Sequence, residues 1–252
     1  MNSKAWRSAS ATRSDDPGPA LKALILAAGR GERMRPLTDA TAKPLLAAGG
    51  RRLIEWQIAA LARAGVREMV VNTAHLPAQF EEVLSDGSRY GVQLAYSREG
   101  ERAEDALETL GGIVHALARL GPSAFIVVSG DIVTDYDYVA LQERAHRIDA
   151  GESDAHLVLV DNPAFHPRGD MALTAGRIDP DGEPRLTYAN IGVFAPRLFA
   201  GLVSGRAKLF PWLYGAARAG RVTGEHAQAR WFNIGTPDEL QRADAELRRC
   251  PP

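Results

Sequence analysis

The 252-residue sequence predicts a doubly wound α/β fold with a mostly parallel, mixed sheet. Strand-like and helix-like segments alternate over residues 21–150, which is the pattern of consecutive β–α–β units. Several strand-like segments are continuous apolar runs, such as FIVVS over 125–129, and such runs are typical of strands covered by helices on both faces. With 45 % hydrophobic and 24 % charged residues, the composition fits one large globular domain.

The first half of this domain contains four predicted strands and four predicted helices. The strands are expected at 21–28, 68–72, 92–96 and 125–129, and the helices at 53–64, 77–84, 107–120 and 137–148. In the first helix Leu53, Ile54, Ile58 and Leu61 recur at helical spacing and form one apolar stripe. Gly65 follows at the position where a glycine commonly ends a helix.

The second half of the chain, 151–250, predicts a hairpin rather than further crossovers. An apolar strand is expected at 156–160, and segments 170–174 and 185–194 flank an Asp-Pro-Asp-Gly turn at 179–182. The remaining elements expected are helices near 196–203 and 208–219, one β segment over 221–233, and a last helix from Pro237 with Thr236 as its N-cap.

Charge and cysteine content exclude several classes of protein. The net charge of −1 implies no broad basic surface, so we expect no nucleic-acid and no membrane partner. No apolar run reaches the roughly 18 residues that a membrane span needs. Residues 1–20 lack the apolar core of a signal peptide and are expected to form a disordered tail. The single cysteine, Cys250, excludes an intrachain disulfide and suits a cytoplasmic location.

The most informative segment is the loop that follows the first predicted strand. Gly29 and Gly31 come directly after the apolar run, where they let backbone N–H groups approach an anion. The cations Arg33 and Lys43 follow and could neutralise phosphate charge. The loop is not a P-loop, because it has no Gly-Lys-Ser/Thr at the required spacing. It is not the dinucleotide fingerprint either, because Met34 stands where the third glycine would fall.

The pattern Leu26-Ala-Ala-Gly-x-Gly-x-Arg-Met-x-Pro-Leu-Thr38, followed by Lys43-Pro44, resembles the signature of the sugar-1-phosphate nucleotidyltransferases. The resemblance implies a Rossmann-like nucleotidyltransferase fold, with 21–150 as the nucleotide-binding half and 151–250 as the sugar-binding half. It assigns nucleotide binding to Ala27, Ala28, Gly29 and Gly31. It assigns phosphate binding in catalysis to Arg33 and Lys43.

Two oxygen-bearing side chains are candidates for a Mg²⁺ site. Asp131 follows the buried strand 125–129 and therefore lies at the carboxyl edge of the sheet, where ligands of open α/β sheets bind. Asn233 stands in Trp231-Phe-Asn-Ile-Gly235, where many relatives carry a second aspartate. Its neutral carbonyl still suits Mg²⁺ when substrate phosphates supply the remaining charge. The resemblance makes these two residues the expected metal ligands.

Further nucleotide contacts are expected at the start of the helix over 107–120 and at the end of the second strand. Backbone N–H groups at a helix start can bind a phosphate or a base carbonyl, and relatives have a glycine-rich element here. The residues assigned to nucleotide binding on this ground are Asn72, Glu108, Thr109 and Gly111. Leu110 replaces a glycine that is common in the family, and the reading of Asn72 as a turn residue stays open.

The second half carries the expected sugar contacts. Gly169 and Asn190 match the backbone glycine and strand asparagine that hold sugar substituents in the family. The Glu-Lys-Pro motif of many relatives is replaced by Arg185-Leu-Thr-Tyr. Together with the short length, these motifs resemble the N-acetylmuramate α-1-phosphate uridylyltransferases, which implies UTP and a sugar 1-phosphate as substrates.

Three alternatives remain open at this stage. The substrate could be another sugar 1-phosphate, such as that of glucose or N-acetylglucosamine, with uridylyl or thymidylyl transfer. The protein could be a non-catalytic nucleotide-sugar sensor on the same fold, or a Rossmann dehydrogenase, which Met34 disfavours. We expect a monomer or a small homo-oligomer.

Overall fold

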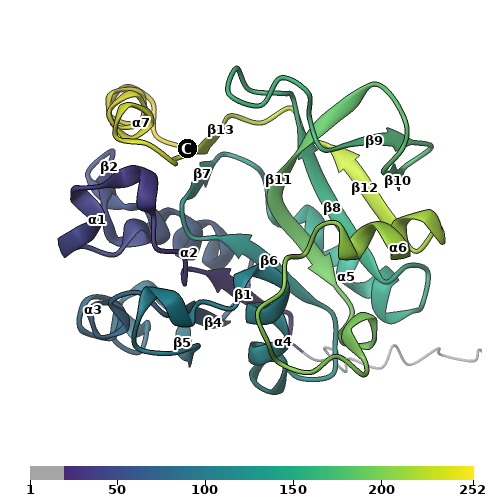
Figure 1. Cartoon of the computed structure of the whole chain (residues 1–252), viewed down its shortest axis with the longest axis horizontal. Helices are drawn as coiled ribbons and strands as arrows, with labels where there is room; N and C mark the ends of the chain where they lie inside the picture. Colours follow the sequence, from purple (N-terminus) through teal and green to yellow (C-terminus); the bar gives the residue numbers. More distant parts are fainter. Residues whose placement is uncertain (1–19) are drawn as a thin grey trace, which may run out of the picture.

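The computed structural model describes residues 20–252, in which a nine-stranded mixed sheet forms the centre of the molecule (Figure 1). Across the sheet the strands are β5 (Gln93–Arg98), β4 (Glu68–Thr73), β1 (Lys22–Leu26), β6 (Phe125–Ser129), β11 (Arg185–Phe194), β8 (Ala155–Val160), β12 (Val222–His226), β10 (Arg177–Asp179) and β9 (Met171–Thr174). Two small ribbons pair β2 (Ala47–Ala48) with β3 (Arg51–Arg52), and β7 (Ile132–Thr134) with β13 (Trp231–Asn233). The predicted tail lies, except for Ala20, outside the described residues.

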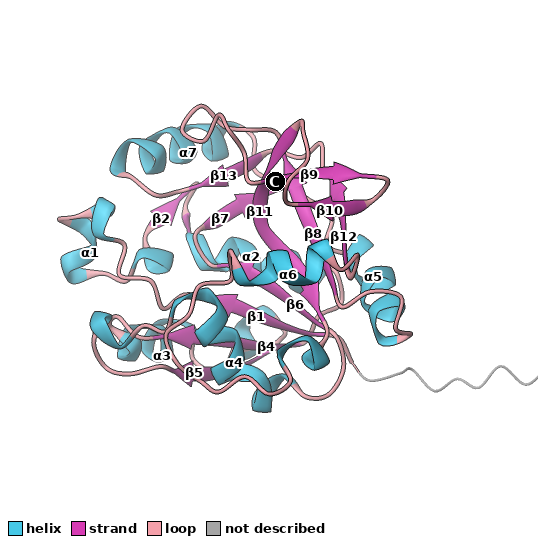
Figure 2. Cartoon of the chain, turned by 45° about the vertical axis from the view of Figure 1, so that its right-hand side comes forward, coloured by secondary structure: helices cyan, strands magenta, loops and turns pink. Residues whose placement is uncertain are grey.

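Helices cover both faces of the sheet, as a doubly wound fold requires (Figure 2). They are α1 (Leu37–Ala40), α2 (Leu53–Arg63), α3 (Pro77–Leu84), α4 (Glu108–Leu120), α5 (Ala140–Asp149), α6 (Trp212–Arg218) and α7 (Pro237–Arg249), with a 3₁₀ turn at Glu32–Met34. Alternate strand residues face opposite sides, so Ile25 packs in the core with α2, α3 and α5, and Leu24 packs in the core with α4 and α6. No helix among residues 20–252 is long and apolar enough to cross a bilayer.

The first half matches the sequence-based expectation closely. Strands β5, β4, β1 and β6 are all parallel, and Leu26 pairs in register with both Asn72 and Ser129. The carboxyl ends of β1, β4 and β6 therefore meet at one edge of the sheet. Helix α5 begins three residues later than predicted, because the Asp137 carboxylate accepts the Val139 N–H and closes a turn before the helix.

The second half differs from the prediction in four elements, one of which is the helix expected near 208–219, since α6 begins only at Trp212. Residues 170–174 and 185–194 do pair antiparallel, but an unpredicted strand, β10, lies between them in sequence and also pairs with β9. The single β segment expected over 221–233 is wrong: it divides into β12 in the main sheet and β13 beside β7. Residues 196–203 form only a 3₁₀ turn at Pro196–Phe199. The predicted cap of the last helix is confirmed, since the Thr236 side chain accepts the Glu239 N–H.

Candidate active site

The loop after β1 is folded tightly around its second glycine. Gly31 has φ +67°, and a Cβ on this residue would lie 3.0 Å from Thr38 Cγ2 and 3.1 Å from Lys43 Cβ. The Thr38 hydroxyl also donates to the Gly31 carbonyl at 2.9 Å. Only glycine fits both this backbone conformation and this space. Its effect is to bring Lys43 back beside the end of β1.

Three cavities meet at this edge of the sheet and share lining residues. The first, of about 580 Å³, is lined by Ala28, Gly29, Asn72, Glu108, Thr109, Asp131 and Arg206, among others. The second, of about 430 Å³, is lined by Ala27, Gly29, Gly31, Arg33, Lys43, Asp131 and Gly235, among others. The third, of about 510 Å³, is lined by Arg33, Glu108, Thr109, Asn190, Lys208, Trp231 and Asn233, among others. Most residues predicted from the sequence therefore border one connected region.

An ion pair between Lys43 and Asp131 lies where the first two cavities meet. Lys43 Nζ is 2.5 Å from Asp131 Oδ2, and both side chains are largely buried. The Gly130 N–H donates to the Leu26 carbonyl at 2.8 Å and holds Asp131 at the end of β1. The predicted phosphate-binding lysine and the predicted metal ligand are thus in direct contact.

The β7–β13 ribbon places Asn233 beside the segment that carries Asp131. Asn233 pairs with Ile132, the residue after Asp131, and the Ile234 N–H donates to the Asp131 carbonyl at 3.2 Å. Asp131 lines the first two cavities and Asn233 the third, so the two predicted ligands lie on adjacent segments but border different cavities. Carboxylate and amide oxygens are both groups that Mg²⁺ accepts when substrate phosphates supply further ligands. Residues 20–252 contain no cluster of three or more His, Cys, Asp or Glu side chains that could hold a metal by themselves.

Arg33 stands between the second and third cavities. Its guanidinium lies close to Gly235, where a Cβ would approach Arg33 Nη2 to 2.8 Å. Within the described residues Arg33 forms no ion pair and no side-chain hydrogen bond. Its charge is therefore available to an anionic ligand.

Asn72 organises the nucleotide side of the site through a buried relay. Its Oδ1 accepts the Ala27 N–H at 2.6 Å, and its Nδ2 donates to Glu99 Oε1 at 2.5 Å. Glu99 Oε2 in turn accepts the Leu107 N–H at 2.7 Å. The Ala27 N–H, which is predicted to contact the nucleotide, is therefore already hydrogen-bonded to Asn72. Those of Ala28 and Gly29 have no partner within residues 20–252.

Burial also affects the electrostatics of this relay. It raises the pKa of the Glu99 carboxyl above its usual range, against the hydrogen bonds from Leu107 and Asn72, which lower it. Gly112 makes room for the relay, because a Cβ there would lie 2.5 Å from Glu99 Oε1 and 2.6 Å from Asn72 Nδ2. Neither Glu99 nor Gly112 was identified from the sequence. Glu99 stands in a charged loop without a motif. Gly112 directly follows Gly111, and no sequence pattern distinguishes the roles of these two glycines.

The structure corrects the expected position of Gly111. Its N–H donates to the Ala207 carbonyl at 3.1 Å, and a Cβ there would lie 2.1 Å from the Gly205 carbonyl oxygen. Gly111 thus packs against the 205–207 segment and does not line the cavities. The neighbouring Glu108, with φ +61°, does line them and pairs with Arg206 at 3.3 Å.

Asn190 lies in the third cavity at an irregularity of the sheet. The register of β11 on β8 shifts between Tyr188 and Gly192, and Asn190 within this bulge has φ +56°. Trp231 Nε1 donates to the Ala189 carbonyl at 2.9 Å and ties the bulge to β13. A bulge changes the direction of the side chain that it carries, and Asn190 lines the third cavity together with Arg33.

Gly169 lies outside the third cavity, contrary to the expectation that it lies beside Asn190. It lines an adjoining depression of about 710 Å³, which shares only His166 and Asp170 with the third cavity. A Cβ on Gly169 would lie 2.7 Å from Asn162 Oδ1, so its close approach serves loop packing.

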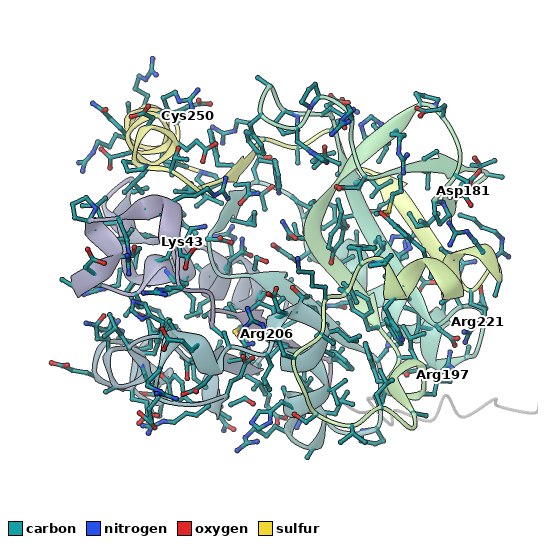
Figure 3. All side chains as sticks on the ribbon, in the orientation of Figure 1. Lys43, Asp181, Arg197, Arg206, Arg221 and Cys250 are labelled. Carbon is teal, nitrogen blue, oxygen red and sulfur yellow. The ribbon has the colours of Figure 1, made fainter. Side chains whose placement is uncertain are left out.

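Two cations of the site were not identified from the sequence. Arg206 lines the first cavity and Lys208 the third, and both come from a loop with no recognisable motif. Figure 3 shows Arg206 near the centre of the molecule and Lys43 to its left, whereas Cys250 lies at the upper margin, directly after α7. No sequence signal marks this loop, because its position depends on packing against α4.

Comparisons with known proteins identify the family of the chain. The family model for nucleotidyl transferases matches residues 22–167, more than half of the chain. The chain is 45 % identical over 229 residues to the N-acetylmuramate alpha-1-phosphate uridylyltransferase of Neisseria meningitidis serogroup B, covering 89 % of this chain and 97 % of that protein. It is 33 % identical over 233 residues to the Caulobacter vibrioides protein of the same name, covering 89 % and 96 %.

A solved structure supports the fold independently. The inositol-1-phosphate CTP transferase from T. maritima superposes with a TM-score of 0.73 at 19 % identity, over 92 % of this chain and 96 % of that one. The predicted doubly wound, Rossmann-like architecture is thereby confirmed. The chain belongs to the nucleotidyl transferase family and is a sugar-1-phosphate nucleotidyltransferase.

Proposed function

We propose that the protein transfers a uridylyl group from UTP to N-acetylmuramate α-1-phosphate, releasing pyrophosphate and forming UDP-N-acetylmuramate. The choice of base and sugar is supported by the 45 % identity to an enzyme of that name along 97 % of its length. In this role the protein would act in the cytoplasm, where it would return a cell-wall amino sugar to its nucleotide-activated form.

The observation that carries the proposed mechanism is the junction of the cavities at Lys43, Asp131 and Arg33. A phosphate oxygen of the sugar 1-phosphate attacks the α-phosphorus of UTP. The new P–O bond forms while the bond from the α-phosphorus to the bridging oxygen breaks, and pyrophosphate leaves with that electron pair. Because the nucleophile is already an anion, the step needs no general base, and catalysis consists of positioning and charge neutralisation.

Each cation has a place in this step. Arg33, which has no partner among residues 20–252, would bind the β- and γ-phosphates and the leaving pyrophosphate. Lys43, which pairs with Asp131 in this structure, would instead contact the α-phosphate and the incoming sugar phosphate. Ala28 and Gly29, whose N–H groups have no partner in the described part of the chain, line the first cavity and would contact the nucleotide. Mg²⁺, when bound, would neutralise phosphate charge, with Asp131 and Asn233 as its protein ligands.

Pyrophosphate release tests this proposal directly. The protein is incubated with UTP or dTTP and with the 1-phosphates of N-acetylmuramate, N-acetylglucosamine and glucose, with and without Mg²⁺. We expect Mg²⁺-dependent release that is fastest with UTP and N-acetylmuramate 1-phosphate. Faster turnover of another sugar would contradict the proposed substrate. Tight binding of UDP-sugars without any pyrophosphate release would contradict the reaction itself.

A further inference from the structure

The carboxylates that line the third cavity already have partners in the protein. Glu108 pairs with Arg206 at 3.3 Å. Asp170 Oδ1 is 3.0 Å from His166 Nε2, and its Oδ2 accepts the Tyr188 N–H at 2.8 Å. Neither carboxylate is therefore free to neutralise a further cation in the cavity.

Two cations of the same cavity have no such partner. Within residues 20–252 neither Arg33 nor Lys208 forms an ion pair or a side-chain hydrogen bond. Four aromatic side chains complete much of the wall: Phe165, Tyr188, Phe210 and Trp231. A charge beside such apolar walls interacts more strongly with a ligand than it would in open water. The cavity thus favours a ligand that carries two separate anionic groups.

The two cations differ in their relation to the phosphate chemistry. Arg33 also lines the second cavity, together with Lys43 and Asp131, so it faces the reacting phosphates of the proposed mechanism. Lys208 lines only the third cavity among the three, with Asn190. The second anion of the ligand would therefore lie on the sugar side.

The backbone around Lys208 is fixed although its side chain is exposed. The Ala207 N–H donates to the Leu107 carbonyl at 2.9 Å, and the Ala207 carbonyl accepts the N–H groups of Leu110 and Gly111. On the other side of Lys208, Leu209 is buried in the core. The base of the lysine is thus held against α4, and only the flexible side chain has to order when a ligand binds.

We propose that Lys208 is a specificity-determining residue that binds a carboxylate carried by the sugar of the sugar 1-phosphate. This inference rests on the proposed function, and it names the residue that recognises the carboxylate of the proposed sugar substrate. N-acetylmuramate differs from N-acetylglucosamine by a lactyl ether, which adds one carboxylate to the sugar. Lys208 then distinguishes these two sugars, because it has an ionic partner with the first and none with the second.

The test compares Lys208→Met and Lys208→Arg with the wild type and with a matched control, Lys22→Met. Lys22 is a half-buried lysine that lies at the start of β1, far from the cavities, and pairs with Glu68 at 2.8 Å. Calorimetry gives the Kd, and pyrophosphate release gives KM and kcat, for the 1-phosphates of N-acetylmuramate and N-acetylglucosamine. For Lys208→Met we expect the Kd and KM of N-acetylmuramate 1-phosphate to rise about 10- to 100-fold, as for the loss of one charged hydrogen bond.

The values for N-acetylglucosamine 1-phosphate should stay within about threefold, and Lys208→Arg should retain most of the preference. Equal losses with both sugars, or no loss with either, would overturn the role of Lys208. A wild type that binds both sugar phosphates equally would overturn it as well. Absence of turnover with either sugar would instead refute the proposed function, and the binding measurements would still decide the role of Lys208.

Discussion

At the scale of single residues, the site is defined by how its charges are paired before a substrate binds. Lys43 and Asp131 neutralise each other at 2.5 Å, whereas Arg33 has no partner within the described residues. A divalent cation at Asp131 would compete with Lys43 and release it toward the phosphates. The pair therefore couples two functions that the sequence presents as separate, the phosphate-binding cation and the metal ligand.

Lys43→Ala should reduce the rate of pyrophosphate release about 10²–10³-fold, because it removes one preorganised charge at the reacting phosphates. The chain should remain folded, since the remaining Asp131 carboxylate is partly exposed and can be solvated. Circular dichroism and thermal unfolding check the fold, with Lys22→Met as the control for loss of a lysine. Near-normal turnover would contradict the role assigned to Lys43.

Asn233→Asp should strengthen Mg²⁺ binding by up to about tenfold, because it adds a negative charge to the proposed ligand set. The measurement is calorimetric titration of Mg²⁺ into the protein with a non-hydrolysable UTP analogue. Asp238→Asn, on the exposed first turn of α7, serves as a control that changes one charge nearby. If the affinity for Mg²⁺ does not change, Asn233 is not a metal ligand.

At the scale of elements, the loop before α4 is shaped by a hydrogen-bond relay behind the first cavity, of which Asn72 alone lines the cavity wall. The relay from Ala27 through Asn72 and Glu99 to Leu107 joins the ends of β1, β4 and β5 to the start of α4. It fixes where Glu108 and Thr109 stand between the first and third cavities. The shape of the nucleotide side therefore depends on a half-buried glutamate in a charged loop.

Gly112→Ala tests this relay, because the added methyl group would overlap both Glu99 and Asn72. We expect a loss of about 1–3 kcal/mol in the free energy of unfolding, together with weaker UTP binding. Gly215→Ala in α6 is the matched control, since that helical position is exposed and a Cβ there meets nothing within 4 Å. The control should be neutral or slightly stabilising. Similar unfolding curves for both variants would contradict the relay.

At the scale of the whole molecule, a second polar cluster ties together segments far from the active site. Glu225 on β12 accepts hydrogen bonds from Tyr136 and from Arg144 on α5, and it lies 3.3 Å from His156 Nε2 on β8. The hydrogen bond with His156, followed by those with Tyr136 and Arg144, lowers the pKa of Glu225 to about 2 despite its burial. The cluster therefore joins β12 to β8 and to α5.

This lowered pKa predicts acid sensitivity with a defined sign. A carboxylate whose pKa is lower in the folded state stabilises the protein above its unfolded pKa of about 4.5, and this stabilisation is lost as the pH falls toward 2. Glu225→Gln should therefore be less stable than the wild type at pH 6. The difference should shrink below pH 4.5 by at most about 1.4 kcal/mol per pH unit.

Urea unfolding at pH 6, 4.5 and 3.5 measures this difference. Glu82→Gln on the exposed side of α3 is the control, and its difference from the wild type should not depend on pH in the same way. Parallel pH profiles for Glu225→Gln and the wild type would show that the Glu225 cluster does not contribute to acid sensitivity.

By itself the sequence determined the parts of this protein that depend on local chemistry. The apolar runs of β1 and β6, the stripe of α2 and the Thr236 cap are short-range patterns. The loop from Gly29 to Lys43 also carried enough mixed chemistry to identify the family. Tertiary structure alone decided which groups meet. The bulge at Asn190, the Asn72–Glu99 relay and the cavity that Lys208 shares with Arg33 each join segments distant in the chain. Such contacts arise from strand register and helix packing, which no local pattern encodes.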